Sequence, residues 1–174
     1  MKPPVIIGVD PGMDGAIAAL VGGELFDVYD MPTRTNVVRS KGKKRNIRSI
    51  DSEATSALLK EIHEAHSPIL STPLLAIESV GARPGEAAGS SFRFGECFGT
   101  FPALAAAEGW VLAVVRSQVW KPAVGLPVGS DKGDSLDLAR ALYPTHAAGT
   151  FKRKKDHGRA DAALIARWAW EVAE

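Results

Sequence analysis

VIIGVDPG, at residues 5–12, is a run of mostly β-branched residues that leads to an aspartate and then to a Pro-Gly pair. Such a run predicts a buried strand over Val5–Asp10, followed by a turn. The strand would end in the carboxylate of Asp10. Because an unpaired buried charge is costly, a carboxylate in this place needs a compensating partner. The stretch therefore predicts both the first strand of a core sheet and a functional group at its end.

Four further apolar runs predict strands, and four periodic segments predict helices. Two of the strands are joined through Gly22-Gly23, a pair that favours a tight hairpin. The predicted strands are residues 14–21, 24–30, 74–79 and 110–115. The predicted helices are residues 51–66, 90–108, 130–142 and 158–174. This order predicts an α/β sheet with antiparallel and parallel parts, in a single domain over residues 1–174.

The helix over residues 51–66 carries two specific expectations. Asp51 is placed to cap its N-terminus, because an aspartate side chain can accept hydrogen bonds from the first free backbone N–H groups. Helical spacing also predicts the stripe that faces the core. The residues of this stripe are Ala54, Leu58, Ile62 and Ala65.

The composition indicates a globular chain that works without a membrane or disulfides. Hydrophobic residues make up 45% of the sequence, enough for a sizeable core. The apolar runs are too short to span a bilayer, which takes about 20 residues. Cys97 is the only cysteine, so the chain can form no intrachain disulfide and no cysteine-based zinc cage. No signal-peptide layout precedes the first strand, and a cytoplasmic location is expected.

The net charge of +1 hides a strong segregation of charge. Residues 34–48 hold seven Lys and Arg and no acid, and residues 152–159 hold five against Asp156 alone. The rest of the chain has nine cations against nineteen acids. This asymmetry predicts an acidic body with two basic arms for a polyanion, the first being a flexible loop along a phosphate backbone. Two solvated surface loops would also account for the charges.

Three acids stand where they could meet. Asp10 and Glu78 end two buried strands, and neighbouring strands lie about 4.8 Å apart. Asp161 shares a helical stripe with Leu164, Ile165 and Trp168, so its side chain would point toward the sheet. Carboxylates side by side repel each other unless a cation lies between them, and Mg²⁺ prefers oxygen ligands. The pattern therefore predicts a divalent-metal site of the kind that cleaves phosphodiesters.

Each of these acids also has an ordinary interpretation. Asp10 before Pro-Gly could simply start a turn, and Glu78 could be a rim acid paired with Arg83 or Arg116. Asp161 and Asp156 could be first-turn acids favoured by the helix dipole. His157, four residues before Asp161, could be a plain exposed histidine. Their joint occurrence beside two basic segments favours the metal site.

At these residues the sequence resembles the RuvC family of Holliday-junction resolvases. The family's strand with an Asp-Pro-Gly turn is matched by GVDPG at residues 8–12. Its glutamate at the end of a later strand is matched by LAIES at residues 75–79, and its acid in an Ala-rich helix by RADAALIA at residues 159–166. SQVWKPAVGL and SDK, at residues 117–126 and 130–132, are similar to a family stretch that carries DNA-contacting lysines.

The resemblance implies an RNase H-like mixed five-stranded sheet, a three-strand antiparallel meander plus parallel strands, flanked by helices. It implies a homodimer in a bacterial or phage-infected cell that cuts four-way DNA junctions with Mg²⁺ or Mn²⁺. Asp10, Glu78 and Asp161 would be metal ligands. The members with the closest pattern are the phage-type and other divergent ones.

Two departures from the family pattern stand out. The fourth acid or histidine is usually three residues before the last aspartate, where this chain has Gly158. His157 or Asp156 must then substitute, His157 as a catalytic group or Asp156 as a metal ligand. The aromatic wedge that often follows the glutamate is also missing, so opening of the junction would fall to Arg83, Phe92 or Phe94.

The expected contacts to DNA are basic residues of both segments and of the stretch between them. Among the tryptophans, only Trp120, beside Lys121, is a candidate for stacking on a base. The expected DNA-binding residues are Arg39, Lys41, Lys43, Lys44, Arg45, Arg83, Lys121, Lys132, Lys152, Lys154 and Lys155.

Three other functions fit parts of the pattern. The chain could be another RNase H-like nuclease, such as an RNase H or a general branched-DNA nuclease. It could be an inactive nucleic-acid-binding module of the same fold. A sugar-kinase or actin-like ATPase half also has a strand aspartate before a phosphate loop, but this chain is too short for the two domains that enclose ATP. No nucleotide cofactor is therefore expected.

Overall fold

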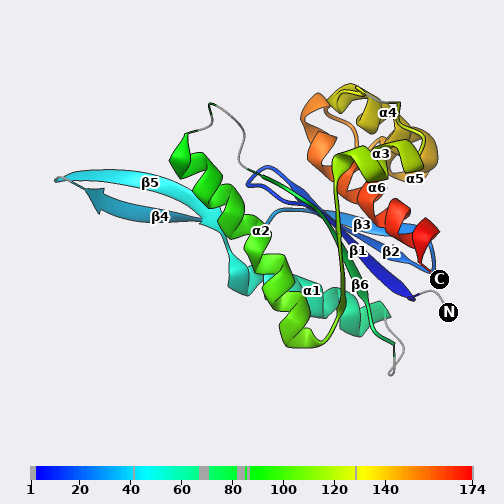
Figure 1. The fold of residues 1–174 in the computed structure, drawn as a ribbon, viewed down its shortest axis with the longest axis horizontal. Helices are drawn as coiled ribbons and strands as arrows, with labels where there is room; N and C mark the ends of the chain where they lie inside the picture. The colour runs from blue at the N-terminus through cyan, green and yellow to red at the C-terminus, as the bar shows by residue number, and fades with distance from the viewer. Residues whose placement is uncertain are drawn as a thin grey trace.

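The computed structural model describes residues 3–40, 42–66, 71–81, 85, 87–127 and 129–173. Its centre is a five-stranded sheet in the order β3-β2-β1-β6-β7 (Figure 1). β1, β2 and β3 form an antiparallel meander, and β6 and β7 continue the sheet parallel to β1. The strands are β1 Val5–Asp10, β2 Ala16–Val21, β3 Glu24–Asp30, β6 Leu74–Glu78 and β7 Val111–Val115. The mixed sheet predicted from the sequence is confirmed.

Helices cover both faces of this sheet. α6 (His157–Val172) packs on one face over β1 and β2, and α1 (Ser52–His66) and α2 (Ala88–Glu108) belong to the core on the other face (Figure 1). The alternation of β1 explains both contacts: Ile6 belongs to the α6 side, whereas Ile7 belongs to the opposite core. The central strand is therefore buried on both faces, as its unbroken apolar run predicts.

The segment between β7 and α6 is helical and lies on the α6 side of the sheet (Figure 1). Asp131 caps α4 in a reciprocal capping box with Asp134, which confirms the expected helix start near residue 130. The sequence did not predict the short helices on either side of α4. The elements of this segment are α3 Ser117–Ala123, α4 Lys132–Leu142, α5 Pro144–Ala147 and the 3-10 turn η1 Lys154–Asp156.

The cap of α1 was predicted correctly, and its buried face only in part. The Ala54 backbone N–H donates to the Asp51 carboxylate at 3.0 Å. The buried residues are Thr55, Leu59 and Ile62, whereas Ala54 is exposed. Ile62 belongs to the predicted stripe and Leu58 is partly buried against the same core, so packing against the sheet turns the buried face from the predicted one toward Leu59. The Thr55 hydroxyl is satisfied locally by donating to the Asp51 carbonyl.

The first basic segment is a β-hairpin and not the flexible loop predicted from its charge. β4 (Thr33–Ser40) and β5 (Lys43–Ile50) pair antiparallel over eight residues each and form a separate two-stranded sheet. Gly42 has a φ of 72°, a conformation that favours glycine in a tight turn. Clustered cations led to the prediction of a loop, whereas the β-branched and polar residues between them allow a regular strand pair.

The second basic segment is compact rather than an extended arm. It comprises residues before α6, the turn η1 and the first turn of α6. Arg153 pairs with Asp156, and Arg159 makes a two-pronged contact with Asp30, with both N–O distances 2.7 Å. Within the described part of the chain, no helix is long and apolar enough to cross a membrane.

Candidate active site

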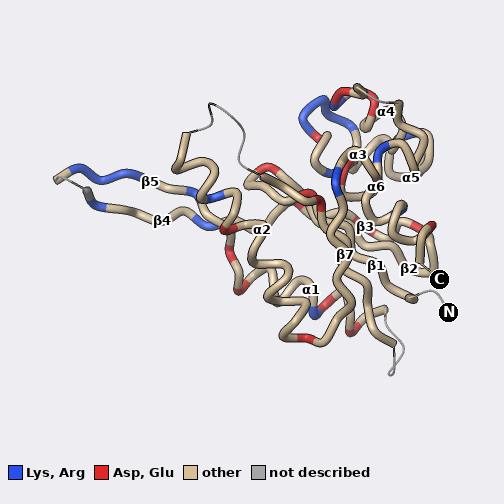
Figure 2. The backbone as a smooth tube through the Cα atoms, viewed as in Figure 1, with Lys and Arg blue, Asp and Glu red and all other residues tan. Residues whose placement is uncertain are grey.

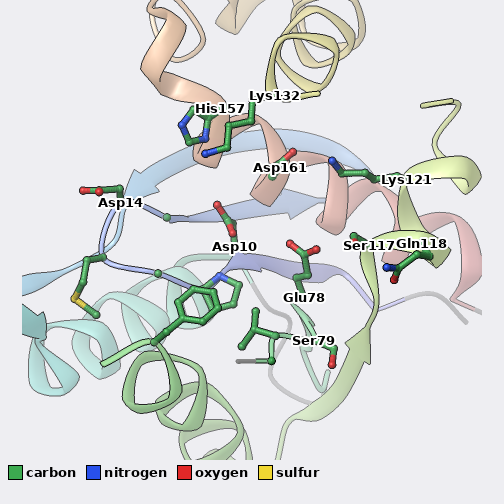
Figure 3. A pocket seen from close by; sticks show the side chains of 17 residues that line it. Asp10, Asp14, Glu78, Ser79, Ser117, Gln118, Lys121, Lys132, His157 and Asp161 are labelled. Carbon is green, nitrogen blue, oxygen red and sulfur yellow. The ribbon is translucent and has the colours of Figure 1, made fainter. Parts of the chain in front are cut away.

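The ends of β1 and β6 bring two carboxylates together. The strands are parallel neighbours with Val9 opposite Ile77, so Asp10 and Glu78 leave the same edge of the sheet. Both line a cavity of about 600 Å³, and Asp161 lines it from the first turns of α6. Figure 3 shows the three carboxylates facing this space from three different elements. The structure thus places Asp10, Glu78 and Asp161 in one cavity.

A missing side chain on β1 allows α6 to deliver Asp161. A Cβ atom at Gly8 would lie 2.2 Å from the Ala162 carbonyl oxygen and 2.7 Å from the Ala166 Cβ. The helix backbone therefore rests directly on the strand at Gly8, two residues before Asp10. This close approach sets Asp161, adjacent to Ala162, at the level of the strand ends.

The surroundings of Asp10 oppose its ionised form. Burial raises the pKa of its carboxyl well above the usual value of 3.8, and the nearby charges of Asp161 and Glu78 raise it further. Lys132 and Lys121 act in the opposite direction but do not cancel the shift. A cation among the three carboxylates would relieve this repulsion.

Glu78 and Asp161 share this environment. Burial raises the pKa of both carboxyls, and the charge of Asp161 adds to the shift of Glu78. The Ser135 hydroxyl lies close enough to lower the pKa of Asp161 somewhat. Even so, Asp161 Oδ1 and Ser135 Oγ are buried without a partner in hydrogen-bond geometry among the described residues. A bound cation would satisfy a buried carboxylate oxygen that lacks a donor.

Two lysines complete the charge balance of the cavity. Lys121 of α3 and Lys132 of α4 line it together with the acids, and Figure 3 shows both side chains reaching toward them. Both were expected to contact DNA, and the structure places both beside the three carboxylates. Trp120, in contrast, is 0% exposed and lies under the Lys121 amine at 5.5 Å from the ring centroid. Its predicted stacking on a base is wrong.

His157 and Asp156 have different surroundings. His157, the first residue of α6, lines the cavity with the three carboxylates. Asp156 lies outside the lining of this cavity and borders a neighbouring one of about 450 Å³. It is 3% exposed, and Arg153 donates to it from the guanidinium at 2.7 Å and from the backbone at 2.7 Å. Its oxygens are therefore already engaged, whereas His157 lines both cavities and borders the three acids in the first.

The structure explains why position 158 holds a glycine, which the sequence alone did not reveal. A Cβ atom there would lie 2.7 Å from the Asp14 carbonyl oxygen and 3.0 Å from Asp10 Oδ2. The start of α6 is packed so tightly against the turn after β1 that no side chain fits. A ligand at this position is sterically excluded, and the nearest preceding side chain that reaches the cavity is that of His157.

Several lining residues were missed by the sequence analysis. Asp14 lines the cavity, as do Ser117 and Gln118 at the start of α3, and Phe94, which was expected only as a candidate for opening the junction, lines it as well. Asp10 precedes the Pro-Gly turn and Asp14 follows it, so the sequence already showed that Asp14 is near Asp10. The two α3 residues lie in the stretch already singled out at residues 117–126, but only its Lys121 and Trp120 had been assigned a role.

The donor set suits a hard divalent cation, although the side chains do not enclose one. Three carboxylates supply only oxygen ligands, and one of their oxygens is buried without a donor. Within the described ranges, no three histidine, cysteine or acidic side chains lie close enough to hold one ion as they stand. The residues therefore fit Mg²⁺ or Mn²⁺ in chemistry, while full coordination needs water, substrate oxygens or a change of rotamer.

The remaining predicted DNA contacts lie on two surfaces. The side chains of Arg39, Lys43, Lys44 and Arg45 are exposed on the hairpin, and those of Lys152, Lys154 and Lys155 are exposed before α6. Figure 2 shows Lys and Arg along β4 and β5, which project from the body. Lys41 and Arg83 lie outside the described residues.

Comparisons with known proteins show which sequences and folds this chain resembles. No protein-family model matches the chain. A stretch of 71 residues, 41% of this chain, is 41% identical to the chloroplastic Holliday junction resolvase MOC1 of Chlamydomonas reinhardtii. The chain spans only 8% of the length of that protein.

Two solved structures resemble nearly the whole chain. Thermus thermophilus RuvC in complex with a Holliday junction substrate superposes with a TM-score of 0.52 at 13% identity, covering 94% of this chain and 91% of that one. A second Thermus thermophilus RuvC structure gives a TM-score of 0.50 at 16% identity, covering 94% and 92%. The chain is thus an α/β protein with an RNase H-like sheet. In particular, it has the fold of the RuvC-like Holliday junction resolvases.

Proposed function

We propose that this protein is a metal-dependent endonuclease that cuts four-way DNA junctions. The observation that carries the proposal is the meeting of Asp10, Glu78 and Asp161 in one cavity that Lys121 and Lys132 also enter (Figure 3). In such a site the carboxylates can bind divalent cations and the lysines can bind the phosphate. Phosphodiester hydrolysis requires both.

The acids are the proposed metal ligands, and His157 is the proposed fourth active-site group. The charges of both Glu78 and Asp161 act on Asp10, so the three carboxylates would hold the bound cations together. When bound, Mg²⁺ or Mn²⁺ would make water a stronger nucleophile and neutralise charge on the phosphate. Asp156 is held by Arg153, so its proposed role is to fix the turn that presents His157.

The chain's own groups account for the rest of the reaction. Lys121 and Lys132 would bind the non-bridging oxygens of the scissile phosphate beside the acids. His157 would carry a proton to or from the reacting oxygens, with the 3′ oxygen as leaving group. The buried floor of the cavity, formed by the ends of β1 and β6, keeps the ligands in place during the reaction.

The proposed substrate, a four-way DNA junction, is inferred from the similarity to junction resolvases and from the basic segments of the chain. One RuvC structure with this fold holds a Holliday junction substrate, and the matched relative is named a Holliday junction resolvase. A four-way junction has two equivalent strands to cut, which suits a homodimer. We propose α2 as the dimer contact, because its small residues and the exposed Phe92 lie on one side of the sheet.

The test is incubation of the purified chain with a labelled four-way junction, with and without Mg²⁺. We expect Mg²⁺-dependent nicks in symmetric pairs near the crossover, with duplex and RNA–DNA hybrid competing poorly. Asp10→Asn should abolish cutting while junction affinity in EDTA stays within about threefold, because the lysines remain. Equal cutting of hybrids would indicate an RNase H instead. Full activity of Asp10→Asn would refute the assigned site.

A further inference from the structure

The β4–β5 hairpin lies outside the cavity and needs its own explanation. Its strands project from the body, away from the central sheet and from the bundle around α4 (Figure 1). Its base is anchored, since Ile50 is 1% exposed and Ser49 is buried. Beyond the base most described side chains are exposed, including apolar Val37 at 62% and Val38 at 43%. Val38 and the partly buried Ile47 border α2 around a shared cavity, whereas Val37 lies on the opposite face. An isolated two-stranded hairpin is marginal in water, which indicates that the outer half is adapted to a partner.

The register of the hairpin distributes its cations over both of its faces. Paired residues share a face and successive pairs alternate, so Val38–Arg45 and Arg39–Lys44 present their side chains on opposite sides. One face carries Arg34, Lys43 and Arg45, and the other carries Arg39, Lys44 and Arg48. The described residues of β4 and β5 include no acid. A ribbon laid flat on one phosphate strand would need cations on only one face.

We propose that the β4–β5 hairpin inserts into the major groove of a duplex DNA arm. The major groove is about 12 Å wide and admits a two-stranded ribbon, whereas the minor groove, at about 6 Å, is too narrow. Phosphates line both walls of the groove, which matches cations on both faces of the hairpin. Val37 and Val38 lie on opposite faces of the hairpin, so the face that turns to the floor of the groove would bring one exposed valine to the base edges, where thymine methyl groups offer apolar contacts.

The hairpin is also joined to the proposed active site, on which this inference rests for its substrate. Arg48 donates to the Asp14 carboxylate at 2.6 Å, to the Met13 carbonyl and to the Thr33 hydroxyl at 3.0 Å. Met13 and Asp14 lie in the turn that follows Asp10. Seven residue steps from Thr33 to Ser40 span about 24 Å at roughly 3.4 Å each, which equals about seven base pairs. The groove contact should therefore fall within one helical turn of the cut phosphate.

Methylation interference by dimethyl sulfate tests the groove directly. The reagent modifies guanine N7 in the major groove and adenine N3 in the minor groove, so one experiment reports on both. The full chain binds the methylated junction in EDTA, and free and bound DNA are compared. We expect interference at guanine N7 on an arm within about ten base pairs of the crossover, and none at adenine N3 in the same interval. The opposite pattern would overturn the proposal.

Two variants separate the shape of the hairpin from its charge. Replacing residues 38–45 by Asn-Gly keeps the base and closes the strands with a two-residue turn. We expect this variant to lose the N7 interference and to bind at least about tenfold more weakly at 150 mM salt. The matched full-length variant carries Arg39→Gln, Lys44→Gln and Arg45→Gln. It should keep the N7 pattern, with a salt dependence reduced by about 0.9 per cation in the log–log slope.

The outcomes distinguish this inference from the proposed function. Symmetric cutting together with an unchanged N7 pattern in the shortened variant would reject the groove contact and leave the nuclease intact. N7 interference without any cutting would support the hairpin's role and reject the catalytic assignment. A shortened variant that becomes monomeric in light scattering, with no N7 signal in the parent, would show that the hairpin meets a second copy and overturn the proposal.

Discussion

The carboxylate cavity and the β4–β5 hairpin are built in opposite ways. The cavity joins Asp10, Glu78 and Asp161, which are far apart in the chain and depend on close packing of α6 against β1. The hairpin is a local structure in which residues 33–50 pair with each other, and its charges are exposed. Chemistry that needs carboxylates held against repulsion requires a rigid floor, whereas attraction to phosphates needs only exposed cations that can reach them.

The largest expected difference between the two regions is in cleavage rate. Asp161→Asn should lower the single-turnover rate on a junction by on the order of 10³, because a ligand charge is lost at the reacting phosphate. Asp156→Asn is the matched control, one turn away and bound to Arg153. Its rate should stay within about tenfold of the parent. Equal losses in both variants would show that Asp156 acts in the cavity and would break the proposed division of roles.

A smaller effect is expected on stability when the packing under the cavity is changed. Gly158→Ala places a Cβ atom 2.7 Å from the Asp14 carbonyl oxygen, so the free energy of unfolding should fall by about 1–3 kcal/mol. Gly149→Ala is the control, because nothing lies within 4 Å of a Cβ atom there. Urea denaturation of the three proteins measures the difference. A Gly158→Ala protein as stable as the parent would contradict the tight contact between α6 and the turn.

The smallest expected effect concerns pH and the carboxylates themselves. Because the fold raises the pKa of Asp10, Glu78 and Asp161, the native state holds protons that the unfolded chain has released. The free energy of unfolding without metal should therefore fall as pH rises through their usual values near 4 toward the raised ones, and stay lower above them. The hairpin contributes nothing of this kind, since its described residues are cations and neutral groups.

Asp10→Asn should remove part of the fall in the free energy of unfolding at high pH, because it removes one of the three carboxylates. In EDTA at pH 8 it should raise the free energy of unfolding by about 1 kcal/mol, whereas the exposed Glu64→Gln should change it little. Mg²⁺ should raise the melting temperature of the parent but not of Asp10→Asn, by linkage of binding to folding. Thermal melts at pH 5 and pH 8, with and without Mg²⁺, measure both effects. A variant that is less stable than the parent in EDTA would contradict repulsion as the source of the shifts.

Local patterns explain why some elements were predicted well. The strand Val5–Asp10 and the cap at Asp51 depend on neighbouring residues, and both were found where expected. The hairpin at residues 33–50 was mistaken for a loop because charge obscured its strand pattern. The buried face of α1 was predicted only in part: Ile62 is buried as expected, but Thr55 and Leu59 are buried in place of Ala54 and Leu58. That choice is made by contact with the sheet.

The sequence alone determined the strands of the central sheet, its mixed character and the three acids, because strand runs, caps and terminal carboxylates are local features. The tertiary structure alone decided which groups surround those acids in their common cavity. It placed α6 directly on Gly8, excluded a side chain at Gly158 and turned His157 rather than Asp156 toward the cavity. These outcomes depend on backbone atoms from distant segments meeting at van der Waals distance, and local sequence patterns do not specify such contacts.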